Sequence, residues 1–228
     1  MPKSDPSLFT VLYEDNHLIA VNKPAGVLVQ GDQTGDVPLS EGVKAYIKEK
    51  YRKPGEVFLG TIHRLDRPVS GLVLFARTSK ALERMNELFR DRDVQKTYWA
   101  IVGKKPAQVE GKLLHWLVKN ELTNTVRAFT KAMPGSQHAE LEYKLIGQLE
   151  HYSLLEVYPH TGRPHQIRVQ LASMGCPIVG DVKYGSPKPN ADGSILLHGR
   201  ALEFMHPVKK EKMRIEAPAP KTEVWQLF

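Results

Sequence analysis

The sequence predicts an α+β fold built on a mixed, largely antiparallel sheet. Two observations lead to this prediction. Short runs rich in branched and aromatic residues, which are typical of strands, recur along nearly the whole chain. Only a few segments show the apolar spacing of a helix, and they are scattered among the strand-like runs.

Length and composition favour one folded domain. The chain has 228 residues, 41% hydrophobic and 25% charged, without an internal repeat, a low-complexity tract or a Ser/Gly linker. These values suit a single domain over residues 1–228, and two small domains would also fit. The single cysteine, Cys176, excludes an intramolecular disulfide and favours an intracellular protein, and its place beside Pro177 in an apolar run predicts a packed thiol.

Neither a signal peptide nor a membrane span is predicted. The N-terminal segment, Met-Pro-Lys-Ser-Asp-Pro, lacks a continuous apolar core of signal-peptide length. No run of about 18 apolar residues occurs anywhere in the sequence. We therefore expect a cytoplasmic protein that does not enter a membrane.

The first half of the chain predicts a strand hairpin and two helices. Residues 8–13 and 18–22 have strand composition, and a short strand at residues 27–29 follows the break at Lys-Pro-Ala-Gly. Ser40 is expected to cap a helix that ends at Lys50, and Ser79 is expected to cap a second helix. The apolar faces are expected to hold Val43, Tyr46, Ile47 and Tyr51 in the first helix and Leu82, Met85, Leu88 and Phe89 in the second.

Two apolar runs between these helices enclose a polar bend. Residues 57–62 and 72–76 have the branched and aromatic content of strands buried on both faces. The bend contains four ionisable residues and is closed by two turn residues: His63, Arg64, Asp66, Arg67, Pro68 and Gly71. It places the Asp66 carboxylate among cationic neighbours at the edge of the core. Spacing alone leaves open a surface turn whose ion pairs each contribute roughly 0 to 1 kcal/mol.

Strands dominate the second half of the chain. They are expected at residues 96–102, 113–118, 139–145, 152–157, 195–204 and 213–217. A short helix at residues 165–173 is expected to end at Gly175. Residues 119–138 are polar and irregular and predict a long excursion with edge strands, and residues 209–212 predict an exposed hairpin turn.

The charge distribution is compatible with a polyanionic partner. The formal net charge is +7, and the sequence pI is about 9.4. Residues 157–180 contain no acidic residue but include four basic side chains: His160, Arg163, His165 and Arg168. Such a locally unopposed basic strip favours nucleic-acid binding.

Several common catalytic layouts are missing from the sequence. It contains no Gly-x-Ser-x-Gly elbow, no Walker A loop and no Rossmann glycine pattern. Its histidines form no His-Glu-x-x-His motif and no zinc-type cluster, and the spacing of His160 and His165 across a proline turn suits structural hydrogen bonding better than ligation. We therefore expect no metal.

The polar bend carries a family resemblance. His-Arg-Leu-Asp-Arg-x-x-Ser-Gly, residues 63–71, resembles the signature loop of the RluA-type pseudouridine synthases, whose Asp is the one essential catalytic residue. The resemblance implies that Asp66 has this role. The family usually has Thr before the Ser-Gly pair, where this chain has Val69, so a hydroxyl that could brace the loop is missing.

Further motifs follow in the order of the family. The Lys-x-Tyr-x-Ala run at residues 96–100 is similar to the second motif and implies that Tyr98 stacks on the target base; a core strand tyrosine is the alternative. Residues 160–171 are similar to the third motif, whose later arginine pairs with the catalytic Asp, which implies Arg168. The alternative there is a helix arginine that reaches phosphate or solvent. Residues 19–29 and 197–207 resemble the first segment and the closing strands of the family.

The resemblance covers nearly the whole chain and implies a fold and a function. The fold is that of the pseudouridine synthases, with a central mixed, largely antiparallel sheet, flanking helices and a central active-site cleft. The function is an isomerase that converts a specific uridine in tRNA or rRNA to pseudouridine, without a cofactor, on an RNA whose target uridine is flipped out. We also expect a monomer that lacks the N-terminal S4 domain found in many relatives.

The resemblance also suggests which residues bind RNA. Arg64 would occupy the space vacated by the target base, Leu65 would pack beneath the site, and the remaining contacts are expected from His63, Arg67, Arg163 and His165. Two other classes stay open: a non-catalytic RNA-binding protein or RNA chaperone with this fold, and a small-molecule hydrolase that uses Asp66 with His63.

Overall fold

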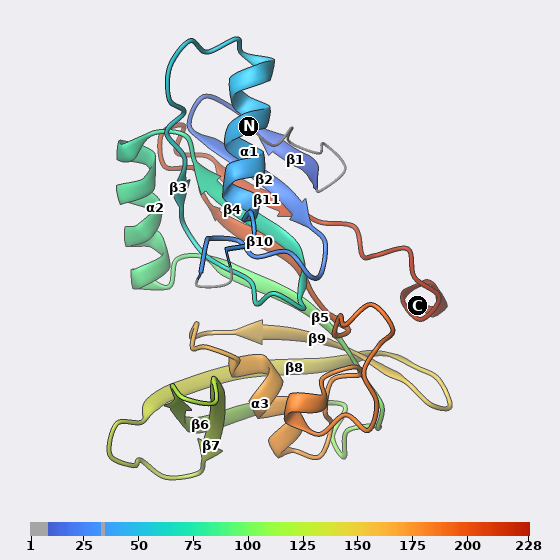
Figure 1. Ribbon diagram of the computed structural model, residues 1–228. Coiled ribbons are helices and arrows are strands. Elements are labelled where there is room, and N and C mark those ends of the chain that lie inside the picture. Colours follow the sequence, from blue (N-terminus) through green and yellow to red (C-terminus); the bar gives the residue numbers. More distant parts are fainter. Residues whose placement is uncertain (1–8, 33–34) are drawn as a thin grey trace. The chain divides into compact units, whose positions relative to one another are not determined.

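The computed structural model describes residues 9–32 and 35–228, and it divides into two compact units (Figure 1). The first unit comprises Met1–Val94 and Gly199–Pro220, and the second comprises Gln95–His198 and Lys221–Phe228. The α+β class is confirmed, since both units are built on antiparallel strand pairs with few helices. The single domain over residues 1–228 stays a prediction.

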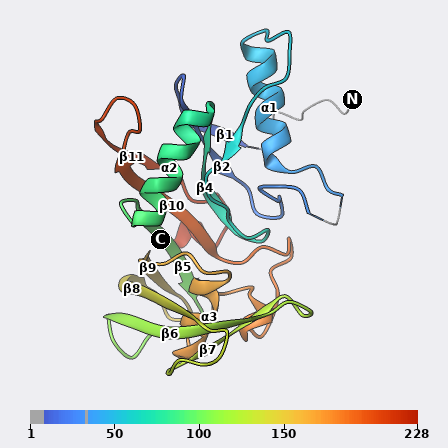
Figure 2. The ribbon, with the colours of Figure 1, turned by 90° about the vertical axis from the view of Figure 1, so that its left-hand side faces the viewer.

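The first unit contains a sheet flanked by two helices. Its strands follow the order β1-β2-β4-β10, with β3 beside β4 and β11 beside β10. The elements are β1 (Thr10–Glu14), β2 (Leu18–Lys23), β3 (Gly60–Thr61), β4 (Ser70–Ala76), β10 (Leu197–Met205, in this unit from Gly199), β11 (Lys212–Glu216), α1 (Leu39–Lys50) and α2 (Ser79–Asp91). Helix α2 packs on β3 and β4, as Figures 1 and 2 show.

Strand β4 lies at the centre of this unit. All of its residues are buried, and it pairs with β2 over its whole length, from Leu18 opposite Ala76 to Lys23 opposite Gly71. Alternate side chains of β2 and β4 join a core that includes Ala81 and Met85 of α2. The prediction that residues 72–76 form a strand buried on both faces is therefore confirmed. The bend at residues 62–69 is joined directly to this buried strand.

The second unit is an antiparallel sheet in the order β5-β9-β8-β6-β7. Its elements are β5 (Gln95–Val102), β6 (Glu110–Asn120), β7 (Thr125–Phe129), β8 (Gln137–Gln148), β9 (Ser153–Pro159), α3 (Gln166–Ser173) and the 3-10 helices Val182–Tyr184 and Trp225–Leu227. Helix α3 packs against β6 and β7 (Figure 1). The predicted excursion at residues 119–138 is the end of β6, a hairpin, the edge strand β7 and the start of β8.

Several predicted boundaries are wrong. The caps of α1 and α2 are Pro38 and Thr78 rather than Ser40 and Ser79, and the Thr78 hydroxyl accepts the Ala81 N–H at 3.2 Å. Only two residues of the predicted strand 57–62 form β3, and residues 27–29 form no strand. The latter segment instead holds the start of α1, where the Leu39 N–H donates to the Leu28 carbonyl at 2.7 Å. The predicted start of β1 at residue 8 lies outside the described residues.

Two side-chain predictions have opposite outcomes. Tyr51, expected on the buried face of the first helix, is 45% exposed. Cys176 is a buried free thiol, as predicted, and burial raises its pKa. Across the described ranges, none of the helices combines the length and apolarity needed to cross a bilayer.

Candidate active site

Asp66 lies half-buried in the bend between β3 and β4, in a turn braced by main-chain hydrogen bonds. Its carbonyl oxygen accepts the Val69 N–H at 3.0 Å, and the next carbonyl, that of Arg67, accepts the Gly26 N–H at 2.7 Å. The first bond closes the Asp66 turn, and the second ties the turn to the loop after β2.

A buried lysine reinforces this connection. Lys23, at the end of β2, is 0% exposed, and its ammonium donates to the carbonyl oxygens of Pro24, Val27 and Arg67 at 2.9, 2.8 and 3.3 Å. Burial lowers its pKa to about 7, while the negative charge of Asp66 acts in the opposite direction. Lys23 is thus both an anchor of the turn and a charge that interacts with Asp66.

Two glycines let β4 and β10 approach each other beside this turn. Gly71 has a φ of +125°, and a Cβ built on it would lie 2.3 Å from the Gly199 nitrogen. A Cβ on Gly199 would lie 3.5 Å from the side chain of Leu65, which is itself buried. The Ser-Gly of the signature loop and the His-Gly of the closing strand are therefore two sides of one close backbone contact, with Leu65 packed against it.

His63 has a structural role. Its Nε2 accepts the Leu74 N–H of β4 at 3.0 Å, and its ring stacks on Phe89 of α2 with centroids 5.3 Å apart. An acceptor Nε2 requires the lone pair of a neutral imidazole, so the hydrogen of the ring nitrogens is on Nδ1. This engagement argues against His63 as the acid or base of a hydrolase, and its contact with RNA stays a prediction.

The two arginines of the bend differ in their surroundings. Arg64 is exposed. Arg67 is also exposed, but its Nε donates to the Gly26 carbonyl at 3.0 Å and its Nη2 lies 2.8 Å from the carboxylate of Asp36. Arg67 therefore holds the neighbouring loops in place, whereas Arg64 projects from the turn that carries Asp66.

In the second unit, Tyr98 lies on the same sheet face as α3. Residues directly opposite one another in neighbouring strands point to the same face of a sheet. One such row crosses this sheet through Tyr98 of β5, Val157 of β9, Tyr143 of β8 and Gly111 of β6. His115, four residues along β6, lies on the same face because strand side chains alternate, and its Nδ1 is 3.1 Å from the amide nitrogen of Gln170 in α3. Half-buried Tyr98 therefore shares a face with the helix that carries Arg168.

Arg168 is buried and bound to a carboxylate that the sequence did not suggest. It is 5% exposed, and its Nε and Nη2 donate to the two oxygens of Asp181 at 2.7 and 2.9 Å. The guanidinium also lies over the ring of Tyr184, 5.0 Å from the centroid. The predicted pairing of Arg168 with Asp66 would join the two units and stays a prediction.

The turn before α3 is held by two buried polar residues. The Gln166 Oε1 accepts from the Thr161 hydroxyl at 2.7 Å and from the Arg163 N–H at 3.0 Å, while its amide nitrogen donates to the Glu140 carbonyl at 3.0 Å. The Arg163 side chain itself donates to the His138 carbonyl at 3.1 Å. Arg163 therefore binds β8 in this structure, and its contact with RNA stays a prediction.

The helix α3 begins at a residue with unusual backbone geometry. His165, its N-cap, has a φ of 51°, in the left-handed region. Its Nδ1 lies 2.7 Å from the hydroxyl of Tyr184, which also accepts the Val126 N–H of β7 at 2.9 Å. Residues other than glycine seldom adopt this conformation, so the contact of His165 with Tyr184 must help to hold the turn in place.

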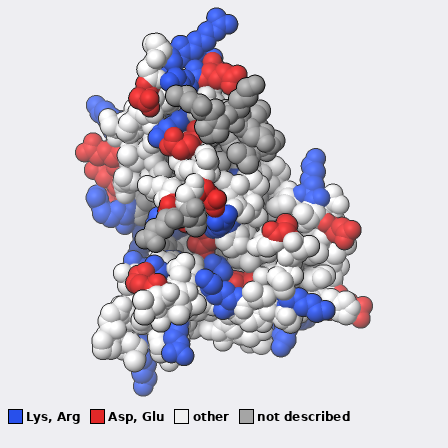
Figure 3. All heavy atoms as spheres, in the orientation of Figure 1, with Lys and Arg blue, Asp and Glu red and all other residues white. Residues whose placement is uncertain are grey.

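The basic strip at residues 157–180 is opposed in space, which corrects the prediction from sequence. His160 Nε2 lies 3.3 Å from Glu142, and Arg168 is paired with Asp181. Figure 3 shows basic and acidic side chains interspersed on one face of the molecule. Nucleic-acid binding therefore cannot be inferred from this strip as an unopposed patch.

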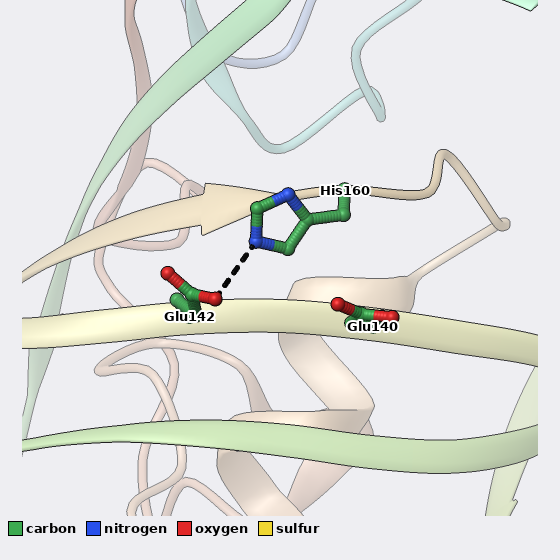
Figure 4. Close-up of side chains that lie close together, drawn as sticks. All are labelled: Glu140, Glu142 and His160. Carbon is green, nitrogen blue, oxygen red and sulfur yellow. Dashed lines mark ion pairs between the residues drawn. The ribbon is translucent and has the colours of Figure 1, made fainter. Parts of the chain in front are cut away.

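Among the described residues, one group of three possible metal ligands lies within 4.8 Å: Glu140, Glu142 and His160 (Figure 4). Lys112 occupies the same place, with its ammonium 2.6 Å from Glu140 and 3.9 Å from Glu142. The hydrogen bond from Lys112 lowers the pKa of Glu140. An ammonium bound to both carboxylates competes with a metal ion, so the group is best described as an ion-pair network on the sheet surface.

Comparison with known proteins decides the family. The sequence profile of the family described as RNA pseudouridylate synthase matches residues 17–173. The chain belongs to this family. The matched range includes Asp66, Tyr98 and Arg168, and the resemblance inferred from the motifs is confirmed.

Relatives with a pseudouridine synthase name are similar over most of the chain. The ribosomal large subunit pseudouridine synthase C of Vibrio cholerae is 34% identical over 216 residues, which cover 91% of this chain and 65% of that protein. The tRNA pseudouridine synthase C of Vibrio cholerae is 31% identical over 237 residues, which cover 96% of this chain and 93% of that protein. This chain therefore spans about two thirds of the first relative and nearly all of the second.

The fold is also that of the pseudouridylate synthases. The solved structure of human RNA pseudouridylate synthase domain containing 4 has a TM-score of 0.79 and 26% identity, and the match covers 95% of this chain and 91% of that one. The α+β class and the family predicted from the sequence are confirmed together.

Sequence reasoning missed four residues that hold the predicted site residues within their own units: Lys23 in the first unit, and Thr161, Asp181 and Tyr184 in the second. Lys23 and Thr161 lie inside segments that resemble the family, but their burial could not be read from those motifs. Asp181 and Tyr184 lie in Gly-Asp-Val-Lys-Tyr-Gly, a run with two turn glycines that could have been singled out as a shaped loop.

Proposed function

We propose that this protein is an RNA pseudouridine synthase and that Asp66 is its catalytic carboxylate. Family membership supports the reaction class, and the single observation that supports Asp66 is its position in a turn fixed by Lys23, Gly26 and Val69. A catalytic group must be held in place if it is to meet a reacting atom, and the brace around this turn supplies that rigidity.

The reaction is an isomerisation of uridine. The bond between C1′ of the ribose and N1 of the base breaks, the uracil rotates, and a new bond forms between C1′ and C5. The proton on C5 is lost and N1 gains one, so the product has the same atoms as the substrate. Asp66 acts on the ribose either by attack at C1′ or by removal of a proton from the sugar.

The other predicted residues have roles around this carboxylate. We propose that Arg168 pairs with Asp66 and keeps it ionised and oriented, and that the ring of Tyr98 stacks on the uracil. Extrusion of the target uridine from its stack costs a few kcal/mol, and we propose that Arg64, which is exposed, fills the space that the base leaves. Leu65, packed against Gly199, forms the floor beneath the turn.

The substrate is a uridine in tRNA or in ribosomal RNA. Relatives of similar identity have names that specify one or the other, and the shared chemistry requires only that the uridine can be flipped out. We propose that the protein acts as a monomer on cytoplasmic RNA, with phosphate contacts from Arg67, Arg163 and His165. Because Arg67 and Arg163 already donate to carbonyl groups, binding of phosphate would replace or share those bonds.

The test is release of tritium from RNA labelled at C5 of uridine. Bulk tRNA and ribosomal RNA are prepared from cells that lack this protein and treated with the wild type, Asp66→Asn and Asp91→Asn. Asp91 is an exposed aspartate at the end of α2 and serves as the matched control. We expect release by the wild type and Asp91→Asn from one RNA pool, and none by Asp66→Asn.

The same variants separate the remaining functions. Asp66→Asn is expected to bind the responsive RNA within a few-fold of the wild type, because the exchange removes a charge without removing volume. Appreciable turnover by Asp66→Asn would reject Asp66 as the catalytic carboxylate. RNA binding by the wild type that weakens steeply with salt, without release from either pool, would instead favour a non-catalytic RNA-binding protein.

A further inference from the structure

The ion pair between Arg168 and Asp181 is the most deeply buried charged contact of the second unit that we describe. The Arg168 side chain is 6% exposed and that of Asp181 is 1% exposed. Removing two charges from water costs several kcal/mol for each ion, and a buried pair adds little net stability compared with apolar side chains of similar volume. Stability alone is therefore a poor explanation for this pair.

The geometry of the pair fixes the orientation of the guanidinium. Asp181 binds the edge formed by Nε and Nη2, at 2.7 and 2.9 Å. Because the guanidinium is planar, this grip sets the plane of the group and turns Nη1 away from Asp181. The ring of Tyr184 lies against the face of the same group, 5.0 Å from its central carbon. Arg168 thus has one edge and one face fixed within its own unit.

The loop that carries Asp181 is itself rigidly held. The Asp181 carbonyl accepts the N–H groups of Tyr184 and Ser186, both at 3.0 Å, and the Ser186 hydroxyl accepts the Gly180 N–H at 3.0 Å. Gly180 has a φ of +87°, and a Cβ there would lie 2.6 Å from the Ser194 carbonyl oxygen. The main chain at Asp181 is therefore held by a closed turn whose hydrogen bonds do not involve Arg168.

We propose that Asp181 is a positioning residue of the isomerisation, which fixes the plane and the direction of the Arg168 guanidinium within the second unit. This inference rests on the proposed function and on the pairing of Arg168 with Asp66. Asp181 touches neither substrate nor reacting atoms; it acts through Arg168. The opposite charges of Asp181 and Arg168 cancel within the pair. A second carboxylate would therefore interact with Arg168 mainly through a directed hydrogen bond rather than through a net charge.

The first test separates turnover from binding. Asp181→Asn keeps the size of the side chain but loses the charged bidentate grip, and we expect kcat to fall about tenfold or more while KM stays within about threefold, because a small displacement of a catalytic group can cost about 100-fold in rate. Asp15→Asn is the matched control, since it removes a partly buried charge from the first unit without touching Arg168. Wild-type kcat in Asp181→Asn would overturn the inference.

The second test asks whether Asp181 acts through Arg168. In the Arg168→Met background both charges can be removed together by Asp181→Leu, which avoids an unpaired buried ion. We expect the second change to lower the rate of Arg168→Met by less than about twofold, although each residue matters alone, because coupled residues are not additive. A further tenfold loss would show that Asp181 acts independently of Arg168.

The third test observes Arg168 directly. The Nε–H of arginine gives an NMR signal, which Arg168→Lys identifies by its loss. We expect NMR relaxation of this signal to show a rigid Arg168 side chain in the wild type and in Asp66→Asn, and a mobile side chain in Asp181→Asn. An unchanged signal in Asp181→Asn from an active enzyme would reject the inference alone. If Arg168 becomes mobile in Asp181→Asn but the wild type isomerises no RNA, the proposed function is rejected. Asp181 would then still be the residue that holds Arg168 in place.

Discussion

Lys23 and Arg67 are joined by a hydrogen bond of 3.3 Å between a buried ammonium and the carbonyl oxygen that follows Asp66. The bond connects the end of β2 with the turn that bears the proposed catalytic carboxylate. Lysines are seldom fully buried, and here all three ammonium hydrogens have carbonyl acceptors. The arrangement couples the charge of Lys23 to the geometry of the Asp66 turn.

This burial makes stability depend on pH. The pKa of Lys23 falls from 10.5 to about 7 on folding, so between these values the unfolded chain binds more protons and the free energy of unfolding rises with pH. Relative to Lys23→Met, the wild type should gain about 1 kcal/mol per pH unit between pH 7 and 9. Urea unfolding at pH 6, 7.5 and 9 measures this difference. The exposed control Lys48→Met should show no such trend, and a flat difference for Lys23→Met would contradict the prediction.

Asp15 stabilises the first unit with a pH dependence of the same sign, but in a more acidic range. It accepts the N–H groups of His17 and Leu18, both at 2.8 Å, and lies 3.0 Å from Nε2 of His206. Although burial alone would raise its pKa, hydrogen bonds from the His17 and Leu18 N–H groups and from the Tyr13 and Lys209 side chains hold the pKa of Asp15 well below its usual range. Its contribution is therefore complete above the unfolded pKa and is lost as the pH falls.

Asp15→Asn should accordingly cost about 2 kcal/mol at pH 7, because a charged acceptor shared by several donors is lost. The cost should shrink toward pH 3, where the unfolded carboxyl is protonated. Thermal unfolding at pH 7 and pH 3 checks this, and an equal loss at both values would show that the charge of Asp15 is unimportant. Isomerase activity per folded molecule should be unaffected, because Asp15 lies in the turn between β1 and β2.

Gly71→Ala should disrupt the first unit. A Cβ at this position would lie within 2.6 Å of three Gly199 backbone atoms, and the φ of +125° is unfavourable for alanine. We expect a loss of about 3 kcal/mol or more, since backbone atoms cannot move aside as a flexible side chain can. Gly26→Ala is an informative control, since Gly26 also has a positive φ but has no atom within 4 Å of its Cβ direction. Equal losses for both variants would show that strain in φ, rather than the contact with Gly199, dominates.

These residues show which parts of the molecule could be predicted from sequence. Strand β4 and helix α2 were predictable because their apolar patterns are local. Asp66 could be selected as a candidate because its motif is contiguous, and its role stays a prediction. Asp181 was not, because it meets Arg168 through a loop thirteen residues away that has no periodic pattern. Lys23 was missed because its ammonium is buried among carbonyl groups of the loop after β2 and of the Asp66 turn, which no pattern within β2 reveals.

Val69 lies in the Asp66 turn and contributes to its main-chain hydrogen bonds. The family usually has Thr at this position, but Val69 is 2% exposed, and its N–H already donates to the Asp66 carbonyl at 3.0 Å. The bonds from Lys23 and Gly26 to Arg67 hold the same turn. A hydroxyl at this position is therefore not required for the brace.

Val69→Thr should accordingly change kcat by less than about threefold, since the turn keeps its main-chain bonds, and it should cost about 1 kcal/mol of stability if the new hydroxyl finds no acceptor. Tritium release and thermal unfolding measure both quantities, and Val69→Ala provides a control that removes volume without adding a polar group. A large gain in kcat for Val69→Thr would mean that the main-chain brace is insufficient and that the missing hydroxyl limits the rate of turnover. Unchanged kcat with Val69→Thr and reduced kcat with Val69→Ala would instead show that packing under the turn, rather than a side-chain hydrogen bond, keeps Asp66 in position.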